Sequence, residues 1–191
     1  MNAIQQTKKS KSWYAIYVKS RHEKVIFSEL QQKGIEASLP LMTVNRQWSD
    51  RRKKVEVPLF RGYVFVKIEL KTEKLSILQT LGVVKFVDFN RVVVPIPEEQ
   101  MYWLQQMVNS RLDLQQEQEL PLGVEVKVIF GPLRGLCGRI KRKHSQTRLI
   151  VWFDAIMQGI SVELDPQNLE LMKKTASAFI SACNQQPVAR G

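Results

Sequence analysis

The chain has 191 residues, of which 44% are hydrophobic and 8% aromatic, a composition typical of a folded protein rather than a disordered one. No stretch approaches the ~18 consecutive apolar residues of a membrane span, and the polar, lysine-bearing N-terminus lacks the apolar segment of a secretory signal. We therefore expect a cytoplasmic protein with no membrane partner. The net charge of +11 lies mainly in the N-terminal half and favours polyanionic partners, although charge alone does not establish nucleic-acid binding.

The residue types needed for metal binding or catalysis do not occur at productive spacings. Cys137 and Cys183 form no CxxC motif, and His22 and His144 stand apart without a neighbouring cysteine. The sequence contains no glycine-rich phosphate loop and no nucleophile with a nearby histidine signature. We therefore expect no metal, no cofactor, no small-molecule substrate and no enzymatic activity.

Strand and helix patterns alternate through the first half of the chain. Residues 13–18 are aromatic and β-branched and predict a strand, and residues 21–33 predict a helix with Gly34 at its C-terminal cap. The helix carries an apolar stripe expected to face the core, made of Val25, Ile26 and Leu30. Residues 35–44 are extended and lead to a charged hairpin tip at 48–54.

Residues 62–69 predict a strand in which apolar side chains alternate. One set is expected in the core, namely Val64, Val66 and Ile68. Tyr63 and Phe65 then lie on the opposite face, beside Lys67. An aromatic pair outside the main core is either a secondary core under a loop or a protein-binding patch, and the residue types leave both interpretations open.

Short elements complete the first half. Residues 72–81 predict a helix with Leu75 and Leu78 on its apolar stripe. Strands are predicted at 83–89 and 92–94. A further helix begins near Pro97, because proline suits the first helical turn and the acidic residues after it suit the positive end of the helix dipole.

A change of pattern near residue 112 predicts a domain boundary. Residues 112–121 are rich in glutamine and glutamate, without an apolar stripe, and are typical of a linker. Short strands with glycine turns follow and predict a small β-barrel. The sequence therefore predicts an α+β protein, divided into a disordered basic N-terminus (1–11), an α/β sandwich with an antiparallel sheet and helices (12–111), a linker (112–121), an SH3-like β-barrel (122–172) and a tail (173–191).

Residues 131–140 form the most specific local motif, beginning Gly131-Pro132-Leu133-Arg134-Gly135-Leu136. The pattern predicts two strands joined by a tight glycine-proline turn, with Leu133 and Leu136 projecting from the loop. Taken alone, this motif fits an ordinary barrel turn and a partner-binding loop equally well.

Several segments, in order along the chain, resemble the NusG family of transcription factors. The glycine-proline motif resembles the KOW motif of that family, and the upstream half resembles its N-terminal (NGN) domain. The upstream likeness rests on Trp13-Tyr14-Ala15 followed by Glu23, on residues 57–66, and on residues 82–87. The resemblance covers about residues 13–172 and departs from the family pattern at Arg61, where proline is usual. The long basic hairpin with Trp48 looks most like the specialised UpxY-type antiterminators of capsular polysaccharide loci.

The resemblance implies a transcription elongation or antitermination factor that binds RNA polymerase and suppresses pausing or termination. It implies docking on the clamp of the largest polymerase subunit through aromatic residues, for which the candidates are Tyr63, Phe65, Phe86 and Phe89. It implies contact with the gate loop at Lys71, Thr72 and Lys74. It also implies that the KOW barrel recruits a ribosomal protein or a termination factor, through Leu133, Arg134 and Leu136.

Two groups of cations are candidates for phosphate contacts with DNA of the transcription bubble. The first lies at the first strand–helix junction and comprises Lys19, Arg21, His22 and Lys24. The second is the consecutive run Arg51, Arg52, Lys53 and Lys54 on the hairpin. Such contacts are sequence-independent and weaken with salt, whereas the alternative is solvated surface charge.

A second class of function remains open from the sequence, a ribosome- or RNA-binding KOW protein that acts independently of polymerase. It requires only the basic surface, whereas the elongation factor also requires an aromatic surface for polymerase.

Overall fold

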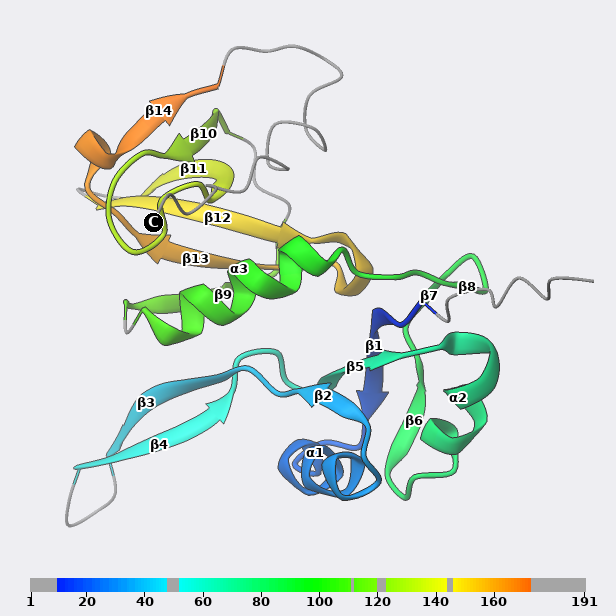
Figure 1. Ribbon diagram of the computed structural model, residues 1–191. Helices are drawn as coiled ribbons and strands as arrows, with labels where there is room; N and C mark the ends of the chain where they lie inside the picture. Colours follow the sequence, from blue (N-terminus) through cyan, green and yellow to red (C-terminus); the bar gives the residue numbers. More distant parts are fainter. Residues whose placement is uncertain (1–9, 48–51, 111, 120–122, 144–145, 173–191) are drawn as a thin grey trace, which may run out of the picture. The chain divides into compact units, whose positions relative to one another are not determined.

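The computed structural model describes residues 10–47, 52–110, 112–119, 123–143 and 146–172 (Figure 1). The chain divides into two compact units, Met1–Glu98 (unit 1) and Glu99–Gly191 (unit 2), which we describe separately. The predicted basic segment 1–11, apart from its last two residues, lies outside the described residues, as do the hairpin residues 48–51 and the predicted tail 173–191.

Unit 1 is built from short strands and helices that match the predicted order. They are β1 (Ser12–Val18), α1 (Glu23–Gln32), β2 (Glu36–Ser38), β3 (Leu41–Gln47), β4 (Arg52–Pro58), β5 (Tyr63–Ile68), α2 (Leu70–Leu78), β6 (Val83–Phe86), β7 (Asp88–Phe89) and β8 (Val92–Val93). Helix α1 ends where predicted, because Gly34 adopts a φ of 72°, a conformation that glycine accepts without strain.

An antiparallel sheet in the order β2-β5-β1-β6 organises unit 1. Its alternating apolar residues pack against α1 and α2 in one buried cluster that contains Val64, Val66 and Ile68 from β5. From the helices, Ile26, Leu30 and Ile77 join this cluster. Each such side chain contributes about 1.5–3 kcal/mol to the stability of the fold when fully buried. Because Val64, Val66 and Ile68 all lie in this cluster, the predicted core face of β5 is confirmed.

The predicted helix stripes are only partly correct. In α1, Ile26 and Leu30 are buried but Val25 is 61% exposed, because it lies about 100° around the helix from Ile26. In α2, Ile77 is the buried residue, whereas Leu75 and Leu78 are exposed. The sequence pattern of α2 therefore predicted the wrong face.

Strands β3 and β4 form a separate two-stranded ribbon, paired from Leu41↔Pro58 to Gln47↔Arg52. Figure 1 shows this hairpin extending away from the four-stranded sheet of the same unit. A hydrogen bond connects this hairpin to helix α1, because Lys24 Nζ donates to the Glu56 carbonyl on β4 at 3.0 Å.

Unit 2 is rich in strands. Its elements are α3 (Glu98–Asn109), β9 (Leu114–Glu117), β10 (Glu125–Val128), β11 (Cys137–Lys143), β12 (Gln146–Phe153), β13 (Gln158–Glu163) and β14 (Leu169–Leu171), with short 3-10 turns at Asp154–Ile156 and Pro166–Asn168. The strands form one antiparallel sheet in the order β14-β10-β11-β12-β13-β9. Its core is aliphatic and aromatic, and Val126, Leu149, Phe153, Ile160 and Val162 are fully buried.

The predicted linker 112–121 is wrong for residues 114–117, which form β9 and pair with β13 from Val162↔Leu114 to Gly159↔Glu117. The predicted boundary after residue 111 also differs from the division observed at Glu98, because α3 packs with the strands of unit 2. The ring of Trp103 on α3 lies so close to Gly135 that a Cβ there would stand 3.3 Å from it.

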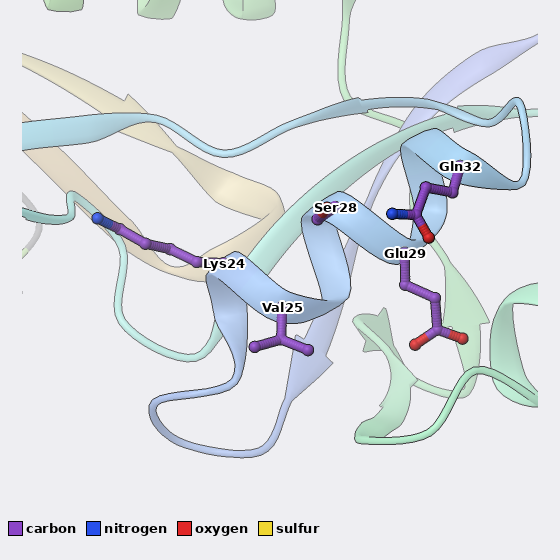
Figure 2. Close-up of a pocket in the computed structure, with 5 residues that line it drawn as sticks. All are labelled: Lys24, Val25, Ser28, Glu29 and Gln32. Atoms are coloured by element: carbon purple, nitrogen blue, oxygen red, sulfur yellow. The ribbon is translucent and has the colours of Figure 1, made fainter.

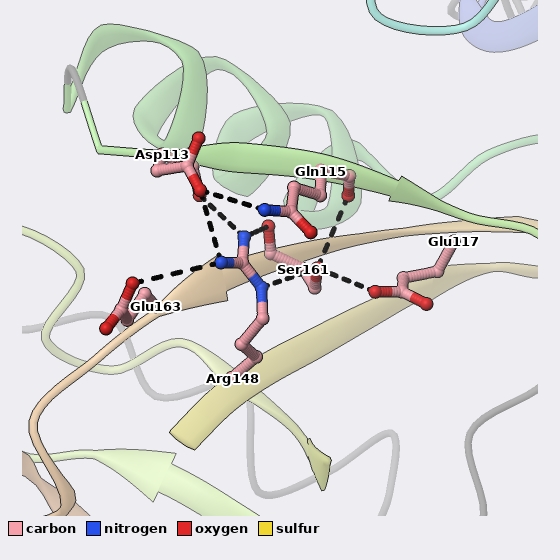
Figure 3. Close-up of polar contacts among 6 residues, drawn as sticks. All are labelled: Asp113, Gln115, Glu117, Arg148, Ser161 and Glu163. Atoms are coloured by element: carbon pink, nitrogen blue, oxygen red, sulfur yellow. Dashed lines mark hydrogen bonds and ion pairs between the residues drawn. The ribbon is translucent and has the colours of Figure 1, made fainter. Parts of the chain in front are cut away.

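Polar side chains anchor β9 to the sheet (Figure 3). Arg148 on β12 is 3% exposed, donates to the Asp113 carbonyl at 2.8 Å and to the Asp113 carboxylate at 3.2 Å, and also bonds Ser161. Ser161 Oγ in turn donates to Glu117 at 2.8 Å. A polar segment thereby becomes a strand, because the buried guanidinium of Arg148 binds Asp113 at one end of it and the Ser161 hydroxyl binds Glu117 at the other.

Among the described residues, no helix is long and apolar enough to cross a membrane.

Candidate protein- and nucleic-acid-binding surfaces

Two tyrosines form an exposed aromatic pair on unit 1. Tyr17 on β1 lies directly opposite Tyr63 on β5, and their ring centroids are 5.5 Å apart in an edge-to-face arrangement. Tyr17 is 42% exposed and Tyr63 is half-buried. Lys85 pairs with Tyr17 from the other side, on β6, so a cation stands in the same row of the sheet. This pair and Lys85 are called the tyrosine surface below.

Gly62 fixes the position of the Tyr17 ring. Its φ is +80°, and a Cβ at this position would lie 2.9 Å from Tyr17 Cε2, so glycine is required for both its conformation and the space. Its carbonyl accepts a hydrogen bond from the Val18 amide at 2.8 Å. The turn before β5 is therefore packed tightly under one of the two exposed rings.

Burial, followed by the proximity of Tyr17, raises the pKa of Tyr63 above its ordinary value. The upward shift further favours the neutral phenol, which is a hydrogen-bond donor as well as an apolar surface. A neutral aromatic side chain with a polar tip is a common anchor in protein interfaces.

Phe65 does not belong to the exposed surface, contrary to the prediction. It is 0% exposed and packs edge-to-face against Phe60 at 5.9 Å. Ala15, its partner across β1, is also buried, as is Trp13. The second face of the sheet is thus itself a core around Phe65, which was the alternative that the alternation pattern had left open.

Of the two other phenylalanine candidates, one is buried and one is exposed. Phe86 is 4% exposed and packs against Tyr14 at 6.4 Å inside the helix-covered core, so it is not a surface residue. Phe89 on β7 is 68% exposed and is available to a partner.

Tyr17 was missed from the sequence although a signal existed. Alternation along β1 puts Tyr17 on the face opposite Ile16 and Val18, both of which are fully buried. What the sequence does not reveal is the register that places Tyr17 against Tyr63.

The gate-loop candidates lie at the start of α2. Lys71, Thr72 and Lys74 are all exposed. Thr72 Oγ1 donates to the Glu69 carboxylate at 2.8 Å, and the Glu69 amide donates to Glu73 at 2.7 Å. These bonds satisfy polar groups at the helix start, which accounts for Thr72 structurally and leaves the two lysines pointing to solvent.

The first cation group occupies the β1–α1 junction, where its four members are exposed: Lys19, Arg21, His22 and Lys24. Arg21 has a φ of 65°, and His22 Nδ1 lies 3.0 Å from the Ser20 carbonyl oxygen, so the junction is a tight turn. The contact from Lys24 to Glu56 brings this group to the base of the basic hairpin.

A shallow depression lies on the outer face of α1 (Figure 2). Its lining residues all come from this one helix, and they are Lys24, Val25, Ser28, Glu29 and Gln32. Lys24 and Glu29 extend in different directions in Figure 2 rather than converging. The depression is therefore the surface of an exposed helix and does not form a ligand site.

The second cation group is only partly described. Lys53 and Lys54 are exposed on β4, on alternate faces of the ribbon. Arg52 belongs to β4, whereas its side chain and Arg51 lie outside the described residues.

The glycine-proline loop of unit 2 presents different residues from those predicted. Leu133 and Leu136 are each 1% exposed, because turns at Arg134 and Leu136 fold the loop back on the strands. Phe130, just before the loop, is 73% exposed, and Arg134 is exposed as predicted. The prediction that the two leucines project outward is wrong.

Within the part of the chain that the structure describes, no group of three or more His, Cys, Asp or Glu side chains is arranged to hold a metal ion.

Comparison with known proteins decides the family. Residues 11–105, about half of the chain, match the family model NusG, described as transcription termination factor nusG. Through these residues the chain belongs to the NusG family. No curated protein sequence matches the chain significantly.

One solved structure of a NusG protein agrees with this fold. The structure titled "Domain interaction in Thermotoga maritima NusG" has a TM-score of 0.50 and 21% identity, over 85% of this chain and 98% of that chain. Two conformations of an MjSpt4:Spt5 complex match at 16% identity and a TM-score of 0.28, over 85% of this chain and 97% and 99% of those chains. The likeness to the Thermotoga protein confirms the predicted α+β fold with a strand-rich second part.

Proposed function

We propose that this NusG-family chain is a transcription elongation and antitermination factor that docks on RNA polymerase through the tyrosine surface of unit 1. The single observation that carries the proposal is the pair of the exposed Tyr17 and the half-buried Tyr63, whose rings are 5.5 Å apart, with the Tyr17 ring over Gly62. Tyrosine is enriched among the residues that dominate protein–protein binding energy. This surface takes the place of the predicted Phe65 and Phe86, which are buried.

Around the tyrosine surface, the exposed Phe89 is a further candidate for the clamp of the largest polymerase subunit. Lys71 and Lys74 at the start of α2 are candidates for the gate loop, and Thr72 stays with them as the residue that orders this helix start. These assignments follow the family resemblance, and the exposure of the residues supports them.

The cations near the β1–α1 junction and on the hairpin are proposed to contact phosphates of the transcription bubble. The hydrogen bond from Lys24 to the Glu56 carbonyl brings the first cation group next to the strand that carries Lys53 and Lys54. Replacing Lys53 and Lys54 by serine should reduce the slope of log affinity against log salt by about 0.7–0.9 for each lost phosphate contact. A slope that does not change would leave these residues as solvated charge.

The barrel is proposed to recruit a second protein, a ribosomal protein or a termination factor, through the loop that carries Phe130 and Arg134. Phe130 replaces the buried leucines as the apolar anchor, because Phe130 and the preceding Ile129 are 73% and 43% exposed and adjacent exposed apolar side chains mark a binding surface. The basic hairpin further supports a specialised UpxY-like role on chosen operons, such as polysaccharide loci, and a polymerase-bound role fits the cytoplasm.

The experiment that tests the proposal is retention of the full chain by purified core RNA polymerase from the same organism. Binding should persist after nuclease treatment of both partners, because the tyrosine surface recognises protein. Binding to RNA alone, with no retention by nuclease-treated polymerase, would instead support an RNA-binding KOW protein that acts away from polymerase.

A further inference from the structure

Glu23 is the one acidic side chain that is buried among the described residues, with 6% of its surface exposed. It is the first residue of α1, where the helix dipole favours a negative charge. Burying a carboxylate is nevertheless costly unless hydrogen bonds compensate for lost water. The bond that Glu23 makes therefore indicates what the residue is for.

That bond reaches the turn beneath the tyrosine surface. Glu23 Oε1 accepts from the Gly62 backbone amide at 2.8 Å, across 39 positions of sequence. The carbonyl of the same glycine accepts from the Val18 amide at 2.8 Å. Both polar groups of Gly62 are thus held, one by the first helix and one by the first strand.

Holding Gly62 in this way sets the geometry of both tyrosines. The Tyr17 ring lies directly over Gly62, where a Cβ would be 2.9 Å away, and Tyr63 is the next residue in the chain. If the amide of Gly62 turned away from Glu23, the peptide plane that precedes β5 would rotate. Tyr63 would then move relative to Tyr17, and the exposed pair would lose its fixed shape.

We propose that Glu23 is a positioning residue for polymerase binding, which orients the tyrosine surface through Gly62 without touching the polymerase. The inference rests on the proposed function of that surface. Rigid presentation of a binding surface raises affinity because less conformational entropy is lost on binding.

The test compares Glu23→Ala with Glu23→Gln in the full chain. Glutamine keeps an oxygen where Gly62 can donate to it, whereas alanine does not. Glu23→Ala should weaken binding to nuclease-treated core polymerase by about tenfold, and Glu23→Gln by less than about threefold. Glu29→Ala is the matched control on the same helix, because the Glu29 carboxylate forms a surface ion pair with Lys33 at 2.8 Å. The Glu29→Ala protein should bind polymerase with the affinity of the wild type.

A spectroscopic measurement separates positioning from general destabilisation. The tyrosine absorbance titration should show the raised Tyr63 pKa moving toward its ordinary value in Glu23→Ala, because the ring becomes more solvated when the turn loosens. Glu23→Gln should titrate as the wild type does. Tyr63→Phe identifies the transition that belongs to Tyr63.

Glu23→Asp provides a second variant should the alanine protein not fold, because it keeps the charge but withdraws the acceptor by one methylene. It should show the same loss of affinity and the same change in titration. A folded Glu23→Asp or Glu23→Ala protein with unchanged affinity, beside a weakened Tyr63→Ala protein, would overturn the role of Glu23. Unchanged affinity in Tyr17→Ala and Tyr63→Ala as well would instead overturn the docking surface itself.

Discussion

Strands β5 and β9 are fixed in their sheets by opposite means. In β5, Val64, Phe65, Val66 and Ile68 are each 0% exposed, so both faces of the strand are buried. In β9, only Leu114 is buried, and the other three residues are glutamine or glutamate. Apolar burial therefore holds the first strand, whereas the polar contacts of Arg148 hold the second.

The contrast shows why one strand is visible in the sequence and the other is not. The apolar content of β5 is local, so the pattern of six residues is sufficient to predict a strand. The residue that fixes β9 lies 35 positions away from Asp113 along the chain. A segment of Gln and Glu resembles a linker until its distant arginine is known.

Truncation of Phe65 should have the largest effect, because it removes a fully buried ring from the strand held by apolar contacts. Phe65→Ala should lower the free energy of unfolding by about 4 kcal/mol. Urea unfolding followed by circular dichroism measures this loss. Phe89→Ala, which truncates a 68% exposed ring, is the control and should cost less than about 0.5 kcal/mol. Equal, small losses in both variants would place Phe65 at the surface, as the family resemblance implied.

Replacement of Arg148 should release β9 while leaving the rest of the sheet folded. Arg148→Met keeps much of the side-chain volume but removes the donors to Asp113 and Ser161, at a cost of about 2 kcal/mol. Hydrogen exchange should then accelerate at residues 114–117 and remain slow in β12. Lys85→Met is the control, because the ion pair of Lys85 with Asp88 lies in unit 1, with the lysine side chain 64% exposed, and does not involve β9. Slow exchange of β9 in the Arg148 variant would show that backbone pairing alone retains it.

Loss of the ion pair between Lys67 on β5 and Glu98 should have the smallest effect on the free energy of unfolding. The hydrogen bond from Lys67 at 2.8 Å holds the pKa of Glu98 below its ordinary value. Its stabilisation is therefore present above the unfolded pKa of about 4.3 and is lost as the pH falls through the lower folded value. Because the Glu98 side chain is 66% exposed, screening limits the effect to about 0.3 kcal/mol. Unfolding of wild type and Glu98→Gln at pH 7 and at pH 3 measures it, and a difference above about 1 kcal/mol would contradict the surface assignment.

The sequence predicted most elements of the fold because their signals are local. The strand at 13–18, the helix ending before Gly34 and the glycine-proline turn of unit 2 are all found. Apart from β9, the errors concern which face of an element is buried: Leu75 on α2 is exposed, and Leu133 in the glycine-proline loop of unit 2 is buried. Which side of a short helix or loop is buried depends on the elements that pack against it. The order of apolar and polar residues within the segment does not contain that information.

For the candidate surfaces too, the sequence predicted exposure correctly only where the residue type alone determines it. Charged residues such as Lys19 and Lys54 are exposed as predicted, because desolvating a lysine is unfavourable wherever it lies. Aromatic residues contribute to both cores and binding surfaces, so Phe65 and Phe86 were assigned to the wrong side. Tyr17 became a candidate only through the register of β1 with β5.

The most direct test of the account is the affinity of core RNA polymerase for the wild type, Tyr17→Ala and Tyr63→Ala. Each tyrosine variant should fold normally and lose on the order of 2 kcal/mol of binding free energy, as expected for an aromatic anchor. This loss corresponds to a dissociation constant about thirtyfold larger than that of the wild type. Val25→Ala, which truncates an apolar residue 61% exposed on α1, should bind as the wild type does. Wild-type affinity in both tyrosine variants would contradict the claim that this chain docks on polymerase through the tyrosine surface.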